Sequence, residues 1–168
     1  YFDLAVAHSA AKPEIKDVVD GCNGCHTPMA FMEGTFPPPR PSEKSMANES
    51  VSCEVCHLIQ ASQTDPPFNF SYLIKPGMTK YSGRQPEIES PAHKIVQSDL
   101  HKTTEFCGNC HNEKNPYGVW VKSTQLEWKE GPYAREGVLC QDCHMPRGEY
   151  RYALMGANRK DARLHLFH

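Results

Sequence analysis

The apolar residues of this chain of 168 residues fall into short periodic segments, separated by polar and proline-containing stretches. In residues 13–20 they are Ile15, Val18 and Val19, at the i, i+3, i+4 spacing of one helix face. Pro13 opens this segment, and proline suits the first position of a helix. The pattern therefore predicts a short helix over residues 13–20. No apolar run reaches the roughly 20 residues that a membrane-spanning helix needs.

A second helix is predicted over residues 92–106. Ser90 and Pro91 precede it, and serine is a favoured N-cap while proline suits the first helical position. His93 and His101 lie on this segment, eight residues apart. On a helix that spacing is a rotation of about 80° and a rise of about 12 Å, so the two imidazoles would serve two different partners.

A third, shorter helix is predicted between residues 123 and 130. Thr124 and Glu127 have the spacing of a capping box, in which each side chain pairs with a backbone N–H at the helix start. Gly131 and Pro132 end the segment.

The stretches between these helices are predicted to be loops. Residues 37–41 are proline-rich and are expected to form an extended polyproline II spacer rather than a partner-binding motif. Residues 60–90 form the longest irregular segment, and connections of this length in a compact domain usually wrap something or have a function. Seven apolar side chains between Phe68 and Tyr81 indicate that this segment packs against the rest of the molecule or against another subunit.

Composition adds three points to this picture. The 14 Pro and 11 Gly agree with a loop-rich chain. The formal net charge is −2, and no clustered basic face of the kind that binds nucleic acid is evident. The chain starts at Tyr1 and shows no signal peptide, so we expect a mature or trimmed form.

One short pattern, Cys-x-x-Cys-His, occurs four times. The four copies, called the first to fourth motifs below, are residues 22–26, 53–57, 107–111 and 140–144. This pattern is the attachment motif of c-type haem. The two thiols add to the vinyl groups of the porphyrin, and the adjacent histidine binds the iron. Four motifs indicate four covalently attached haem c groups, held by Cys22, Cys25, Cys53, Cys56, Cys107, Cys110, Cys140 and Cys143.

The alternatives for these cysteines are a zinc site, a thiol-disulfide motif and a disulfide framework. Zinc sites do use paired Cys-x-x-Cys, but they do not require a histidine after every second cysteine. With nine His in 168 residues, four such coincidences have a chance on the order of 10⁻⁵. All eight cysteines lie in the motifs, so haem is strongly favoured.

Four haems also constrain the fold. Each macrocycle would share only about 42 residues, so haem faces rather than aliphatic side chains would supply most of the buried apolar area. We therefore expect one tetrahaem domain over residues 1–168, mainly α with a high loop content and little or no β-sheet. A weak internal repeat, 1–60 and 92–168 joined by a wrapping loop over 60–91, is a further interpretation.

The nine histidines divide into two groups. The proximal iron ligands are expected to be the motif histidines His26, His57, His111 and His144. The candidates for the opposite side of each iron are His8, His93, His101, His165 and His168. Because five candidates meet four vacancies, we expect two His ligands on every iron and therefore low reduction potentials.

The candidates are not equal. His8, His93 and His101 are the stronger ones, whereas His165 and His168 compete for the last vacancy. His165 is slightly preferred because leucines flank it, and His168 could instead bind a haem of a neighbouring subunit. Methionine ligands are less favoured: Met145 follows a proximal histidine directly, and Met29, Met32, Met46 and Met78 are expected in loops, packed against porphyrin.

Residues 127–146, with Cys140-Gln141-Asp142-Cys143-His144-Met145-Pro146 at their end, resemble the cytochrome c-554 and hydroxylamine-oxidoreductase-like superfamily of multihaem cytochromes. That group has a similar haem site after a helix of the same kind, often followed by a His-x-Phe segment such as the one at 165–167. Residues 51–57 resemble a second haem site of the group. His8 resembles its upstream ligand, so the resemblance implies that His8 pairs with His57.

The resemblance also implies a function. Members of the superfamily carry electrons along closely packed haems, and some tetrahaem members polymerise into extracellular filaments. We expect an electron carrier or conduit that is not an enzyme, located in the periplasm or outside the cell. Its expected partners are redox donor and acceptor proteins, extracellular acceptors and, for a filament, further copies of itself. The alternative is an enzyme with one open haem that acts on nitrite or hydroxylamine.

Overall fold

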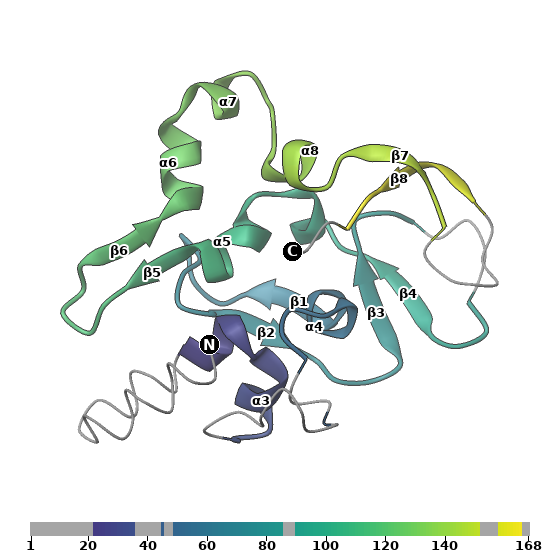
Figure 1. Cartoon of the computed structure of the whole chain (residues 1–168), viewed down its shortest axis with the longest axis horizontal. Helices are drawn as coiled ribbons and strands as arrows, with labels where there is room; N and C mark the ends of the chain where they lie inside the picture. The colour runs from purple at the N-terminus through teal and green to yellow at the C-terminus, as the bar shows by residue number, and fades with distance from the viewer. Residues whose placement is uncertain (1–21, 36–44, 46–48, 86–89, 152–157, 166–168) are drawn as a thin grey trace.

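The computed structural model describes residues 22–35, 45, 49–85, 90–151 and 158–165 (Figure 1). The predicted helix over 13–20, the polyproline segment 37–41, His8 and His168 lie outside these residues. Among the described residues no helix is long and apolar enough to cross a membrane.

Each of the four motifs is helical. Residues 22–26 are helical and are followed by α3 (Pro28–Met32), so Met29 and Met32 lie in a helix rather than in a loop. The other three motifs lie in α4 (Cys53–Leu58), α5 (Glu105–His111) and α8 (Cys140–His144). Side chains three and four residues apart share one face of a helix, so each motif directs both thiols and the following imidazole to one side.

Eight short strands pair into four two-stranded sheets among the described residues. The antiparallel pairs are β1 (Ile59–Ser62) with β2 (Tyr72–Ile74), β5 (Asn112–Lys114) with β6 (Trp120–Ser123), and β7 (Arg147–Tyr150) with β8 (Arg159–Arg163). The parallel pair is β3 (Thr79–Ser82) with β4 (Lys94–Gln97).

The expectation of a mainly α fold with little or no sheet is therefore wrong. Strands follow three of the motif helices closely: β1 follows α4, β5 follows α5, and β7 follows α8 (Figure 1). A two-stranded sheet satisfies the backbone hydrogen bonds of the chain as it leaves a haem motif, and it needs only a short returning partner. Residues 60–91 are likewise not one irregular loop, because β2 and β3 lie within them.

The predicted helix over residues 92–106 is also wrong. Residues Lys94–Gln97 form β4, a 3₁₀ turn η3 (Leu100–Lys102) follows, and α5 begins only at Glu105. Ile95 and Val96 are β-branched, which weakens a helix and suits a strand, and β3 supplies the partner. His93 and His101 consequently lie on different elements.

The third predicted helix is confirmed as α6 (Thr124–Glu130), with α7 (Pro132–Arg135) after it. Its N-cap is Ser123, one residue earlier than the predicted Thr124, and the Ser123 hydroxyl donates a hydrogen bond of 2.7 Å to Glu127. The Trp128 indole N–H donates to the Val138 carbonyl at 2.8 Å, which holds α6 against the approach to the fourth motif.

Polar side chains fill much of the described interior. The buried apolar residues are Ala30, Val55, Leu58, Ile59, Tyr72, Tyr81 and Ala162, and the buried polar ones are Asn23, Thr27, Thr104, Asn109, Asn112, Gln125 and Gln141. Asn112 shows how they are satisfied. Its amide N–H groups donate to the Pro67 carbonyl and to Gln125, at 2.9 and 3.0 Å, and its oxygen accepts from the backbone N–H of Gln125. This network joins α5, β5 and α6.

Candidate haem centre

The third motif contacts two of the others through its thiols. Cys110 donates a hydrogen bond to Cys25 of the first motif, which lowers the pKa of Cys25 and raises that of Cys110. Cys107 donates to Cys140 of the fourth motif, which raises the pKa of Cys107 and lowers that of Cys140 to about 7. The first, third and fourth motifs are thus neighbours, and the third lies between the other two.

Residues 68–72 fasten the first motif to the third. The Phe70 N–H donates to the Asn109 carbonyl at 2.6 Å, inside the third motif. The Tyr72 hydroxyl donates to the Gly24 carbonyl at 2.5 Å, inside the first. The Phe70 ring also lies against Gly24, where an added Cβ would be only 2.3 Å from the ring. Glycine is therefore required at that position of the first motif.

Three imidazoles gather at the second motif, and we call His57, His101 and His165 the imidazole cluster. The ring centroid of His57 is 6.1 Å from that of His101 and 6.0 Å from that of His165. The Nδ1 of His57 lies 2.6 Å from the Tyr81 carbonyl, and the Nδ1 of His165 lies 2.9 Å from the Arg163 carbonyl. An N–H donated from Nδ1 to a carbonyl fixes the tautomer in which Nε2 serves as a metal ligand.

β8 brings His165 to this cluster. The Arg163 guanidinium pairs with Asp142 of the fourth motif at 2.8 Å and donates to the carbonyls of Gln141 and Met145. The chain thus folds back over the fourth motif, and His165 then reaches the second. No sequence pattern predicts that His165 lies beside His57, because this placement depends on the pairing of β7 with β8.

His101 and His93 both carry a buried ring nitrogen without a partner among the described residues. His101 Nε2 lies 3.0 Å from the Cys56 carbonyl, while its Nδ1 is unpaired. His93 precedes β4 and has an unpaired Nδ1. Burial lowers the pKa of His26, His101, His111 and His165, which favours the neutral imidazole that binds iron.

Comparison with known families agrees with these motifs. The family described as "Cytochrome c554 and c-prime" matches residues 5–58, which contain the first two motifs. The family described as "NapC/NirT cytochrome c family, N-terminal region" matches residues 92–165, which contain the other two. The chain is a multihaem c-type cytochrome. No curated protein sequence gives a significant match.

The fold of this cytochrome is similar to that of a solved relative, the penta-heme cytochrome c552 from Thermochromatium tepidum. The TM-score is 0.56 and the sequence identity is 24%, so the similarity is one of fold. It covers 76% of the present chain and 39% of the relative.

The residues of the cytochrome fit haem c. Each motif offers two thiols and an imidazole on one helix face, and further imidazoles with unpaired buried nitrogens lie among the motifs. We predict that the eight motif cysteines hold the macrocycles, and that the nine histidines named above include the axial ligands. The group supplies an iron that gains and loses one electron.

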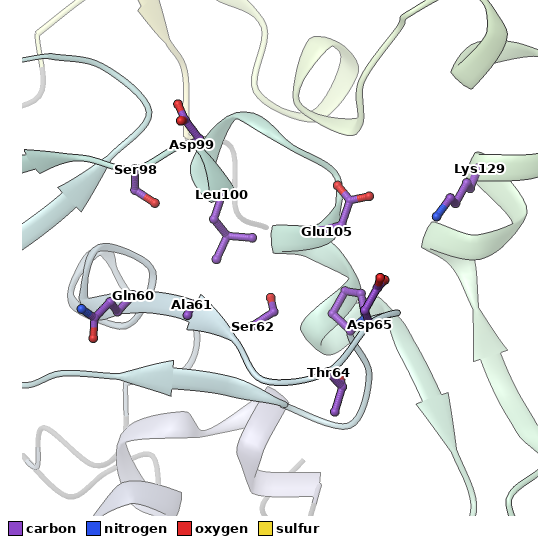
Figure 2. A pocket seen from close by; sticks show the side chains of 11 residues that line it. Gln60, Ala61, Ser62, Thr64, Asp65, Ser98, Asp99, Leu100, Glu105 and Lys129 are labelled. Carbon is purple, nitrogen blue, oxygen red and sulfur yellow. The ribbon is translucent and has the colours of Figure 1, made fainter.

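A cavity of about 600 Å³ lies beside α5 (Figure 2). Ser62, Asp99, Leu100, Glu105 and Lys129 are among the side chains that line it, and they come from β1, the η3 turn, α5 and α6 (Figure 2). No cysteine or histidine lines it.

Proposed function

We propose that this cytochrome carries electrons through four covalently bound haems that form one conduit. Electron transfer between haems requires that their edges lie close together. The supporting observation is the pair of thiol contacts at the third motif, Cys110 to Cys25 and Cys107 to Cys140. Haem attachment would turn these thiols into thioethers and remove their hydrogen bonds, but it would keep the sulfur atoms at the edges of their macrocycles, so the haem of the third motif would lie between those of the first and fourth.

The second motif joins the same group. Cys56 lies near enough to Cys107 and Cys110 to contribute to the raised pKa of both thiols, after hydrogen bonding and burial, and burial raises the pKa of Cys56 itself to about 11. The haem of the third motif is then the central one. The spatial order of the haems therefore differs from the order of their motifs in the sequence.

Bis-histidine ligation of all four irons is the second part of the proposal. Two of the five candidate distal ligands, His101 and His165, lie against the proximal His57, and His93 has an unpaired buried nitrogen. An iron with two protein ligands favours electron transfer over substrate binding. We therefore propose a carrier rather than an enzyme.

Haem attachment of this kind takes place outside the cytoplasm, so the proposed location is the periplasm or the outside of the cell. The proposed partners are redox donor and acceptor proteins. Assembly into a filament, with a distal histidine supplied by a neighbouring copy, remains a prediction. Electron microscopy of the native protein tests it, and isolated particles at every concentration would contradict it.

Spectroscopy and mass spectrometry of the intact protein test the main proposal. The mass is expected to exceed that of the chain by four haems, and the ferric spectrum is expected to be low-spin throughout. A substantial high-spin signal would contradict bis-histidine ligation at every iron. Turnover of nitrite or hydroxylamine with a reduced dye, above that of a free-haem control, would favour the enzyme instead.

A further inference from the structure

Arginines gather on one face of the β7–β8 pair, at the opposite end of the molecule from the β5–β6 hairpin (Figure 1). The register sets Arg147 opposite Arg163, and Arg159 lies four residues before Arg163 on the same strand. Opposite residues of paired strands, and alternate residues of one strand, point to the same side of a sheet. The three arginines therefore share a face, and Asp161 lies on it between Arg159 and Arg163.

Two carboxylates neutralise this face only in part. Asp161 is shared, because Arg84, two residues after β3, and Arg147 both pair with it, at 3.7 and 2.9 Å. Arg163 pairs with Asp142 of the fourth motif at 2.8 Å. These ion pairs hold the guanidinium groups in place while leaving an excess of positive charge.

The other basic side chains of the β7–β8 region form no ion pair with another described residue. Arg151 donates to the neutral amide of Asn158 at 3.1 Å, and Asn158 in turn donates to Glu149. The group that we call the basic surface consists of Arg84, Arg147, Arg151, Arg159, Lys160 and Arg163. With the three carboxylates named above and here, the formal charge is +3 (six minus three), although the whole chain carries −2.

The basic surface is fixed to the fourth motif. Arg163 donates to the carbonyls of Gln141 and Met145, at 2.5 and 3.1 Å, and β7 begins three residues after His144. In the proposed conduit the fourth motif contacts the third through Cys140 and so forms one end. A protein that exchanges electrons at that end would lie against the basic surface.

We propose that the basic surface is the docking site of a redox protein with an acidic surface, which exchanges electrons with the haem of the fourth motif. This inference rests on the proposed electron-transfer function and names the partner. One electron passes from the reduced partner to a ferric iron, which becomes ferrous, and no bond forms or breaks. Opposite charges raise the rate of encounter by roughly 10–10³-fold and orient the two proteins. Guanidinium groups already held by ion pairs lose less freedom on docking.

Electron transfer from an acidic protein tests the proposal. The probe is a reduced plant-type [2Fe–2S] ferredoxin, a one-electron donor of low potential. Arg159→Glu and Lys160→Glu are each expected to lower its second-order rate of reduction of the ferric cytochrome by about threefold or more at low salt. This difference is expected to disappear near 1 M salt, where the Debye length is about 3 Å. Stopped-flow absorption measures the rates, and the exposed Lys160 gives the result even if Arg159→Glu fails to fold.

Lys75→Glu is the matched control, because it makes the same change of charge at an exposed residue just after β2. It is expected to keep the wild-type rate. Oxidation of the reduced cytochrome by the small cation hexaammineruthenium(III) is expected not to slow in any variant. The proposal is overturned if Lys75→Glu slows the ferredoxin reaction as much as Lys160→Glu, or if the wild-type rate does not depend on salt.

Two other uses of the basic surface give different results. If Arg159→Glu and Lys160→Glu shift a midpoint potential but leave the ferredoxin rate unchanged, these side chains serve a propionate of the chain's own haem. If they abolish sedimentation with phosphatidylglycerol vesicles and leave that rate unchanged, the surface binds an anionic membrane. Either result overturns the proposal.

Failure of the underlying function has its own signature. A wild-type protein without four low-spin one-electron couples would contradict the proposed carrier. A protein that has these couples, and is reduced by ferredoxin equally fast with and without Arg159 and Lys160, would contradict the docking site alone.

Discussion

The hydroxyl of Tyr72, on β2, donates a hydrogen bond of 2.5 Å to the backbone carbonyl of Gly24, which lies between the two cysteines of the first motif. The two residues are 48 positions apart in the sequence. Tyr72 is buried, and burial raises its pKa, so the phenol remains protonated and donates throughout the ordinary pH range. The first motif is thereby held by a strand that follows the second.

Removal of this hydroxyl is the first prediction. Tyr72→Phe keeps the ring but leaves the Gly24 carbonyl without its donor. The free energy of unfolding is expected to fall by about 1–3 kcal/mol, the usual cost of an unpaired buried group. Urea unfolding measures it. Tyr117→Phe is the control, since Tyr117 is 90% exposed, and an equal effect of the two changes would contradict a role for the Tyr72–Gly24 bond.

Asn112 carries the second prediction. Asn112→Ala removes four hydrogen bonds and leaves Gln125 and the start of α6 unpaired in the interior. We expect the free energy of unfolding to fall by about 3 kcal/mol or more, since several buried polar groups lose their partners together. Asn158→Ala, at an exposed position, is the comparison. If the free energy of unfolding fell equally in the two variants, the buried network would stabilise the fold no more than an exposed asparagine does.

The imidazole cluster gives the third prediction. His165→Ala is expected to convert one iron from low-spin to high-spin, because the distal ligand at that iron is lost. His168→Ala is expected to leave the spectrum low-spin. Electron paramagnetic resonance of the ferric protein measures both. The reverse result, with a high-spin iron only in His168→Ala, would assign the ligand to His168.

Asp161 gives the fourth prediction, which concerns pH. A hydrogen bond from Arg147 is the main cause that lowers the pKa of Asp161, with further contributions from the charges of Arg84 and Arg163. A carboxylate with a lowered folded-state pKa stabilises the fold above its unfolded pKa, and this contribution is lost as the pH falls through the folded value. Wild type is therefore expected to be more stable than Asp161→Asn near neutral pH, and the difference is expected to vanish in strong acid.

Urea unfolding of both proteins across this pH range measures that difference. Glu136→Gln serves as control, because Glu136 is exposed and forms no ion pair with another described residue. A gap between wild type and Asp161→Asn that persists unchanged in acid would show that the carboxylate charge is not its cause.

The sequence alone determined the chemistry of this protein. Four Cys-x-x-Cys-His motifs can be recognised from the spacing of neighbouring residues, because one turn of helix is enough to bring two thiols and an imidazole to the same side. The helix Thr124–Glu130 was predictable for the same reason, since its start and end depend on neighbouring residues. Beyond the motifs, the sequence left five candidate histidines, and only for His8 did the resemblance imply a partner, His57.

Tertiary structure decided what depends on residues far apart in the chain. Lys94–Gln97 is a strand because β3 lies beside it, although the residues before it favour a helix start. His165 lies against His57 because Arg163 is bound to Asp142 of the fourth motif, and Cys25 meets Cys110 because Tyr72 and Phe70 hold the first motif to the third. Such contacts have no local pattern, since each depends on the pairing of separate segments.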